Sequence, residues 1–315
     1  MNATAPIEGL AAEATDLVKT FDGKTAVDGA SLSVPAGSIY GFLGPNGAGK
    51  TTTLRMMLGI IDPDSGHRTL LGNEHPLRVA HDVGYLPEER GLYPAMSAKE
   101  AIAFMGALRG LPLKEGRPRA VELLEGHGLA EWVDKPIRSL SKGMAQTVQL
   151  LGTIVHRPRL VVLDEPFSGL DAINQGKLED LIRRLAAEGT TVIFSTHVIA
   201  HAERLCEKVA IIANGAIAFE GGVDEARNRL SPIVNLRTRE ADGPWLADLP
   251  ADARRSGNEF RFELPGSGPE KMLKSLIDHG AGIDTLSIER PGLHDAFVAI
   301  AGEAVAAQMK KDARS

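Results

Sequence analysis

Short, continuous apolar runs alternate with stretches of helical periodicity through the first two-thirds of the chain. The apolar runs predict buried strands over residues 38–43, 83–86, 160–163 and 190–195. Apolar side chains spaced three and four residues apart predict helices over residues 51–60, 98–108 and 178–185. Unbroken apolar strands are typical of a parallel sheet, because helices then shield both of its faces from water. The pattern therefore predicts an α/β fold.

Two local signals sharpen this pattern. Ser97 and Glu100 have the spacing of a capping box, which predicts that a helix begins just after Ser97. Asn214-Gly215 separates two apolar runs, residues 209–213 and 216–219. Asn-Gly favours a tight turn, so these runs are predicted to form a β-hairpin.

The pattern changes after about Leu230. It predicts strands over residues 233–239, 260–264 and 283–288, helices over residues 271–279 and 293–309, and loop across residues 245–258. This β-β-α-β-α order is typical of a small α+β domain. We therefore expect two domains, residues 1–230 and residues 231–315.

The composition is that of an ordinary folded protein. Apolar residues make up 43% and charged residues 24% of the 315 residues, which excludes a mostly disordered or collagen-like chain. Lys and Arg number 35 against 41 Asp and Glu, so the net charge is −6. A mildly acidic protein does not favour binding nucleic acid over a broad face, and we expect no nucleic-acid partner.

Cysteine content and hydropathy favour a cytoplasmic location. Cys206 has no second cysteine with which to form a disulfide within the chain, which suits a reducing compartment. No stretch reaches the roughly 18 consecutive apolar residues that predict a membrane-spanning helix. Residues 1–6 lack both the basic cluster and the apolar core of a signal peptide.

A glycine-rich turn between the first predicted strand and the first predicted helix matches the pattern G-x-x-x-x-G-K-[ST]. Its glycines let successive backbone N–H groups point at one phosphate, and the following helix adds the positive end of its dipole. Lys50 would reach the β- and γ-phosphates, and Thr51 would ligate Mg²⁺. The candidate phosphate-binding residues are Gly44, Pro45, Asn46, Gly47, Ala48, Gly49, Lys50, Thr51 and Thr52.

Two acids, Asp164 and Glu165, follow the strand predicted over residues 160–163. The carboxyl ends of parallel strands are where such sheets bind ligands. Asp164 would hold Mg²⁺, and Glu165 is a candidate to orient or deprotonate an attacking water. An acidic helix cap after a strand is the alternative, and the nearby phosphate loop disfavours it.

Further motifs support a family resemblance. Leu140-Ser141-Lys142-Gly143-Met144-Ala145-Gln146, then Ser168-Gly169-Leu170-Asp171, then a lone His197 follow the phosphate loop in the order found in ABC-type ATPases. Over residues 15–229 the chain resembles the nucleotide-binding subunit of an ABC transporter. The resemblance implies a P-loop NTPase fold with a helical subdomain at about residues 90–155 and, after residue 230, the accessory domain of exporter ATPases.

The family's residue roles then fall on particular positions. Phe21 would stack on adenine, although a core phenylalanine is the alternative. Ser141 and Gly143 would contact the γ-phosphate of the ATP bound to a partner subunit, and Ser141 is also a good helix N-cap. His197 would contact the γ-phosphate and help to position Glu165.

Two residues depart from the family pattern. Glu88 stands where a glutamine usually contacts Mg²⁺ and water, and a carboxylate there can still ligate Mg²⁺. An exposed acid on a loop is the alternative. Residues 87–93 resemble a subgroup that includes sodium- and drug-exporter ATPases, so we interpret Glu88 as a feature of that subgroup. Met144 replaces a common glutamine and leaves Ser141 and Gly143 in place.

The resemblance implies an ATP-binding and ATP-hydrolysing subunit that uses ATP and Mg²⁺. Two copies, or related subunits, would close around ATP and drive export by a separate integral membrane partner, which places the chain at the inner face of the cell membrane. A soluble ABC-type ATPase that acts on ribosomes or DNA is the alternative. A P-loop kinase or GTPase would lack the segment around Ser141. A regulator without turnover is disfavoured by Glu165 and His197.

Overall fold

The structure is a computed structural model that describes residues 9–89 and 91–312. The expectation for residues 1–6 lies outside the described residues, as does position 90 at the edge of the predicted helical subdomain. The chain divides into two compact units. One is the described part of residues 1–223 and 300–315, and the other is residues 224–299.

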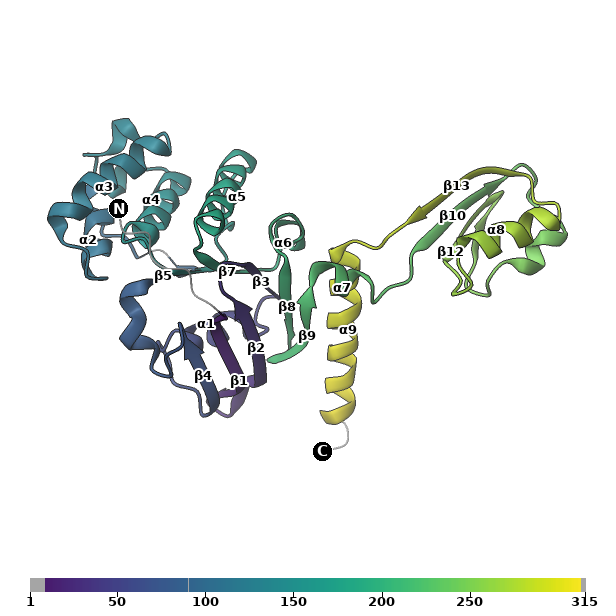
Figure 1. Ribbon diagram of the computed structural model, residues 1–315, viewed down its shortest axis with the longest axis horizontal. Helices are drawn as coiled ribbons and strands as arrows, with labels where there is room; N and C mark the ends of the chain where they lie inside the picture. Colours follow the sequence, from purple (N-terminus) through teal and green to yellow (C-terminus); the bar gives the residue numbers. More distant parts are fainter. Residues whose placement is uncertain (1–8, 90, 313–315) are drawn as a thin grey trace. The chain divides into compact units, whose positions relative to one another are not determined.

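A six-stranded sheet with the strand order β5-β6-β7-β3-β8-β9 forms the centre of the larger unit (Figure 1). Its strands are β3 Ile39–Leu43, β5 Val83–Leu86, β6 Leu160–Asp164, β7 Thr191–Thr196, β8 Lys208–Ala213 and β9 Ala216–Gly222. Neighbouring strands are parallel except β8 and β9, which form the predicted hairpin. Both turn residues, Asn214 and Gly215, have positive φ, as the tight turn requires. The predicted α/β fold is confirmed.

A three-stranded antiparallel sheet, which the sequence pattern did not reveal, packs below the first. Its order is β2-β1-β4, and its strands are β1 Leu10–Phe21, β2 Lys24–Pro35 and β4 Ser65–Leu70. Helix α1 Lys50–Met57 belongs to the core that both sheets share, together with buried Leu17 and Phe42. The register of β1 against β2 shifts at several points, so their apolar residues do not keep a strict period of two.

Helices α5 and α6 cover the opposite face of the parallel sheet, and three further helices gather beyond its β5 edge (Figure 1). Ser97 caps α2 by accepting a hydrogen bond from the Glu100 N–H at 3.3 Å, as predicted, whereas the Glu100 carboxylate pairs with Arg117. Across the part of the chain that the structure describes, no helix has both the length and the apolar character needed to span a membrane. The bounds are α2 Ala98–Ala107, α3 Leu113–Gly126, α4 Lys142–Ile154, α5 Ala172–Ala187, α6 Ile199–Leu205 and α7 Val223–Arg227, with 3-10 turns η1 Pro76–Asp82, η2 Ala130–Trp132 and η3 Ile137–Ser139.

The smaller unit is an antiparallel sheet with the order β11-β12-β10-β13. Its elements are β10 Ile233–Thr238, η4 Pro244–Asp248, β11 Arg254–Ser256, β12 Glu259–Glu263, α8 Pro269–Asp278 and β13 Ile283–Glu289, and helix α9 Leu293–Asp312 follows. Residues 245–258, which were expected to be rich in loop, also contain most of η4 and the short strand β11. All three β11 residues are exposed, so their sequence carries no apolar alternation, and pairing with β12 makes the strand.

His156 follows helix α4 directly and lies beside the sheet, with both ring nitrogens buried. Burial lowers the pKa of His156 to about 4, because the charged imidazolium cannot be solvated there. In the unfolded chain a histidine takes up its proton near pH 6.5. Between these values only the unfolded chain is protonated, so the folded state loses stability as the pH falls from about 6.5 towards 4.

We predict that His156→Leu reduces this pH dependence. Between pH 7 and pH 5 the parental protein should lose about 1–2 kcal/mol more unfolding free energy than the variant, because only the parental unfolded chain gains a proton at this position. Urea denaturation at the two pH values measures the difference. The matched control is His67→Leu at an exposed position of β4. Equal pH dependence in His156→Leu and the parental protein would contradict the prediction.

Candidate functional site

The glycine-rich loop between β3 and α1 is shaped by two close backbone approaches. Gly49 has φ 104°, and a Cβ there would lie 2.6 Å from the Ala26 carbonyl oxygen. A Cβ at Gly44 would lie 2.6 Å from the Ile212 carbonyl oxygen, so neither position accepts a side chain. No side chain caps α1. The N–H groups of its first turn therefore face the loop, where an anion can accept from them.

Lys50, the first residue of α1, is 6% exposed and turns back over the loop. Its ammonium donates hydrogen bonds to the carbonyl oxygens of Gly44 at 2.8 Å and Pro45 at 3.2 Å. It also lies 3.1 Å from Oε1 of Glu165, which is 8% exposed. The structure thus joins the predicted phosphate loop to the predicted catalytic acid through a buried ion pair.

Asp164 and Glu165 are held at the end of β6 by Ser195, the residue of β7 that pairs with Asp164 in the parallel register. The Ser195 hydroxyl donates to Asp164 Oδ1 at 2.6 Å and accepts from the Glu165 N–H at 2.9 Å. Asp164 Oδ2 is buried and has no hydrogen-bond partner among the described residues. A buried carboxylate oxygen without a partner is costly, so this atom fits a role as ligand to a cation or to its water.

Glu165 also contacts His197, the residue that follows β7. His197 Nδ1 lies 2.9 Å from Glu165 Oε2, and because a carboxylate only accepts hydrogen bonds, Nδ1 carries the hydrogen. Glu165 has φ 49°, a left-handed backbone conformation that is strained for a residue with a side chain. The bond from its N–H to Ser195 and the bond from the Ser168 N–H to its carbonyl oxygen hold this conformation.

A cavity of about 230 Å³ opens beside the two acids. Asp164, Glu165 and Glu88 line it together, so the structure brings this loop glutamate to the same space as the acids of β6. Glu88 itself is exposed. No group of three or more His, Cys, Asp or Glu side chains that could hold a metal by themselves occurs within residues 9–89 and 91–312. Thr51, the third predicted metal ligand, lies in the first turn of α1 beside Lys50.

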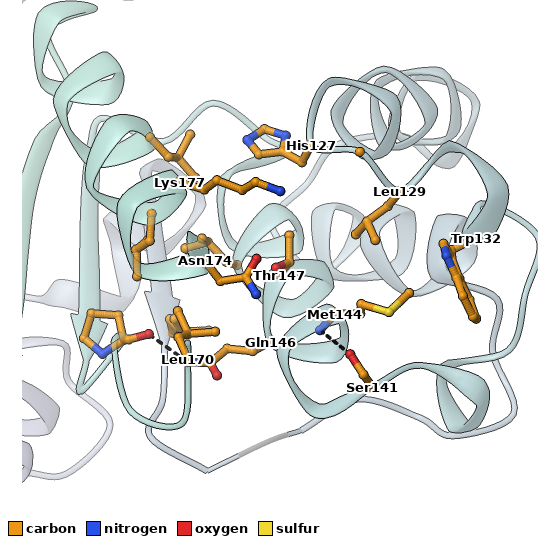
Figure 2. A pocket seen from close by; sticks show the side chains of 16 residues that line it. His127, Leu129, Trp132, Ser141, Met144, Gln146, Thr147, Leu170, Asn174 and Lys177 are labelled. Carbon is orange, nitrogen blue, oxygen red and sulfur yellow. Dashed lines mark hydrogen bonds between the residues drawn. The ribbon is translucent and has the colours of Figure 1, made fainter. Parts of the chain in front are cut away.

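The segment around Ser141 begins helix α4 and borders a second cavity of about 250 Å³ (Figure 2). Ser141 caps the helix by accepting from the Met144 N–H at 3.3 Å, which confirms the predicted cap. Gln146, one turn further, donates from its side chain to the Pro166 carbonyl oxygen at 2.7 Å and borders both cavities. Helix α4 is therefore tied to the residue that follows Glu165.

Phe21 ends strand β1 with its ring 46% exposed, which excludes the core alternative, and the Lys19 ammonium lies 5.6 Å from the ring centroid. An exposed aromatic ring is available to stack on a planar ligand. Among the described residues, neither Ser141 nor Gly143 forms a hydrogen bond with Lys50, Glu165 or His197. Their predicted role concerns a partner subunit's nucleotide.

Sequence reasoning missed Ser195 and the bridging role of Gln146. The Ser195 hydroxyl binds both acids at the end of β6, and the sequence signal for it was a polar residue near the end of the neighbouring buried strand. Gln146 stands inside the segment that carried the resemblance, but its spacing does not reveal which carbonyl it contacts.

Comparisons with known proteins agree with this geometry. The family described as ABC transporter matches residues 27–168. The daunorubicin/doxorubicin resistance ATP-binding protein DrrA of Streptomyces peucetius is 31% identical, over 93% of this chain and 92% of that protein. The linearmycin resistance ATP-binding protein LnrL of Bacillus subtilis (strain 168) is 30% identical, over 92% of this chain and 98% of that protein. The solved structure of cbiO1 from Clostridium perfringens, part of the ABC transporter complex cbiONQ, matches with a TM-score of 0.61 and 26% identity, over 69% of this chain and 90% of that one.

We predict that Ser195→Ala lowers the unfolding free energy by about 2–3 kcal/mol, because it leaves a buried carboxylate oxygen and a buried N–H without their partner. Urea denaturation measures the loss. Ser139→Ala is the matched control, since its exposed hydroxyl donates to the Pro136 carbonyl oxygen and its removal should cost under about 0.5 kcal/mol. Equal effects of the two substitutions would contradict the structural role of Ser195.

Proposed function

The chain belongs to the ATP-binding subunits of ABC transporters, and we propose that two copies of it close around ATP to drive export through a separate membrane partner. As a member of this family it binds ATP and hydrolyses it to power transport. The alternative of a ribosome- or DNA-directed ATPase finds no support, because the matched relatives are transporter subunits.

One observation carries the proposed mechanism: Glu165 is shared between Lys50 and His197 at the mouth of the phosphate loop. Lys50 donates its hydrogen bonds to the carbonyl oxygens of Gly44 and Pro45, and its ammonium forms an ion pair with Glu165. The phosphates of ATP carry more negative charge than these partners and would draw the Lys50 ammonium to the β- and γ-phosphates. Glu165 would then lose its cation and become free to accept a proton from the attacking water.

His197 would move between two partners in this scheme. While its Nδ1–H donates to Glu165, the Nε2 of a neutral imidazole has only a lone pair and repels phosphate oxygens. A contact with the γ-phosphate therefore requires that the imidazole turn its N–H from Glu165 to the phosphate or take up a second proton. Either change links release of Glu165 to the presence of the terminal phosphate.

The residues near the acids fit Mg²⁺. Asp164 Oδ2 is buried without a partner among the described residues, Glu88 borders the same cavity, and Thr51 follows Lys50 on α1. Oxygen ligands of this kind suit Mg²⁺, which supplies positive charge against the triphosphate when bound. Because the protein offers few carboxylates here, phosphate oxygens and water would complete the set of ligands.

Pairing of two copies would complete each site. Ser141 caps α4 and, with Gly143, would offer the N-terminus of that helix to the γ-phosphate held by the other copy. The loop from Ser168 to Asp171 begins three residues after Glu165 and would lie near the junction of the two copies. The γ-phosphate would link the halves, and its hydrolysis would release them.

A membrane partner is proposed because transport requires a pathway across the bilayer. None of the helices in the described residues can provide one. The structural relative cbiO1 is part of a transporter complex, which supports the same arrangement here. We therefore place this chain in the cytoplasm, bound to the inner face of the membrane through its partner. The loop around Glu88 and the helices α2 and α3 are the expected docking surface.

We predict that Glu165→Gln abolishes turnover but retains ATP. Loss of the general base should lower kcat by at least about 100-fold, and the unhydrolysed γ-phosphate should hold two copies together. ATP hydrolysis and light scattering with ATP and Mg²⁺ measure the two effects. Lys50→Ala is the control, because without the ammonium the variant should neither bind ATP tightly nor pair.

The trapped Glu165→Gln protein also serves as bait for solubilised membranes. Recovery of an integral membrane protein in equal amount supports the proposed partner, whereas ribosomes alone would favour the alternative. Hydrolysis at the parental rate would remove Glu165 from its proposed role. If two copies of the variant do not pair when ATP and the membrane partner are supplied, the proposed closure around ATP is wrong.

We predict that Glu88→Gln weakens the response to Mg²⁺, because a neutral amide is a poorer ligand than a carboxylate. The Mg²⁺ concentration at half-maximal hydrolysis should rise by about 3- to 10-fold. Glu89→Gln is the matched control, since Glu89 is the neighbouring exposed acid and is not among the residues that line the cavity beside Asp164 and Glu165. An unchanged Mg²⁺ titration in Glu88→Gln would make Glu88 a bystander.

A further inference from the structure

A buried aromatic stack lies directly behind the catalytic segment. Phe167, two residues after Glu165, is 4% exposed, and its ring lies flat against the imidazole of His201. The ring centroids are 3.8 Å apart and the planes differ by 6°. On another side Phe167 meets the ring of Phe194 edge-on, with centroids 5.8 Å apart. Both neighbours belong to the segment that carries His197, since Phe194 lies on β7 and His201 on α6.

Two charged side chains hold the His201 ring in place. Its Nδ1 lies 3.0 Å from Glu179 Oε1 on α5 and 3.0 Å from Arg204 Nη2, so the nitrogen has a partner in either tautomer. Arg204 also donates to Glu179 from Nε at 3.1 Å and from Nη2 at 2.5 Å. His201 is 3% exposed and Glu179 7%, so the ring has little freedom to turn.

The Glu179 carboxylate remains charged in this setting. Burial by itself raises the pKa of Glu179, but the hydrogen bonds from Arg204 and His201 outweigh that effect, and the pKa lies below its usual value. A charged carboxylate is the stronger acceptor, and it fixes both the guanidinium and the imidazole. The three side chains therefore form one polar cluster, in which His201 and Glu179 are buried and Arg204 is exposed, and the face of the His201 ring packs on Phe167.

The cluster's position suggests what it does. The hydrogen bond between Glu165 and His197 joins two segments at a place where the His197 side chain is 46% exposed. Two residues beyond Glu165 and four beyond His197, the same two segments meet again in the buried stack. A buried contact with a fixed ring plane resists sliding better than one half-buried hydrogen bond does.

We propose that His201, held by Glu179, is a positioning residue for ATP hydrolysis: its stack on Phe167 sets the spacing between the Glu165 and His197 segments. His201 touches no reacting group and acts only through Phe167. The inference rests on the proposed role of Glu165. Catalytic groups lose activity steeply when displaced by about 1 Å, whereas nucleotide affinity depends mainly on the phosphate loop.

The test compares His201→Phe with His201→Leu in the full chain. Both variants lose the Nδ1 contacts and both leave an apolar side chain, but only phenylalanine offers a flat ring to Phe167. His201→Leu should lower kcat at least about 10-fold with the KM for ATP within about twofold, and His201→Phe should stay within about threefold of the parental kcat. Phe167→Leu should match His201→Leu, and the double variant should lose no more than either single one.

Several results would overturn the inference. Equal kcat in His201→Phe and His201→Leu means that the stack does not matter, and fully additive losses mean that His201 does not act through Phe167. If His201→Leu does not fold, Phe167→Leu takes its place in the comparison with His201→Phe, and equal kcat in these two variants overturns the inference. Glu165→Gln is assayed alongside. If it is inactive while the His201 variants are normal, only this inference fails, whereas an active Glu165→Gln removes the proposed catalytic role and this inference with it.

Discussion

The buried pairing of Lys50 with Glu165 is the interaction on which the site depends. Each side chain is less than a tenth exposed, and a charge buried to that extent is stable only while an opposite charge or good hydrogen bonds accompany it. The pair therefore holds the phosphate loop and the carboxylate together and keeps both ready for a competing anion. A nucleotide whose phosphates bind the Lys50 ammonium would remove the cation that is paired with Glu165. Nucleotide binding would in this way change the charge around the proposed general base.

The short segment from Asp164 to Ser168 receives contacts from β7, α4 and α6 of the larger unit. Ser195 on β7 holds its first two residues, Gln146 on α4 binds the Pro166 carbonyl oxygen, and His201 on α6 stacks on Phe167. Strand β7, helix α4 and helix α6 thus all contact the stretch of backbone that follows β6. A displacement of α4 would act on Pro166, the residue next to Glu165, so the same contacts that fix the acid can carry motion to or from it.

The strained backbone of Glu165 fits this picture. A positive φ in a residue with a side chain costs free energy, and it persists here because its N–H and carbonyl oxygen are both hydrogen-bonded. The conformation directs the carboxylate towards Lys50 and His197 instead of along the strand direction. The smaller unit has an apolar core of its own around Trp245 and Phe260.

The sequence by itself determined the phosphate loop, the acids after β6, the helix starts at Ser97 and Ser141 and the tight turn at Asn214-Gly215, because each depends on residues close together in the chain. The order of the motifs also identified the family. Only the tertiary structure decided the antiparallel sheet, whose bulged strands lack a steady period, and the edge strand β11, which exists through pairing with β12. It also brought Ser195 to Asp164 and Glu165 and stacked His201 on Phe167. These contacts join residues at least 30 positions apart, and no local pattern records which side chains a parallel register or a packed helix brings face to face.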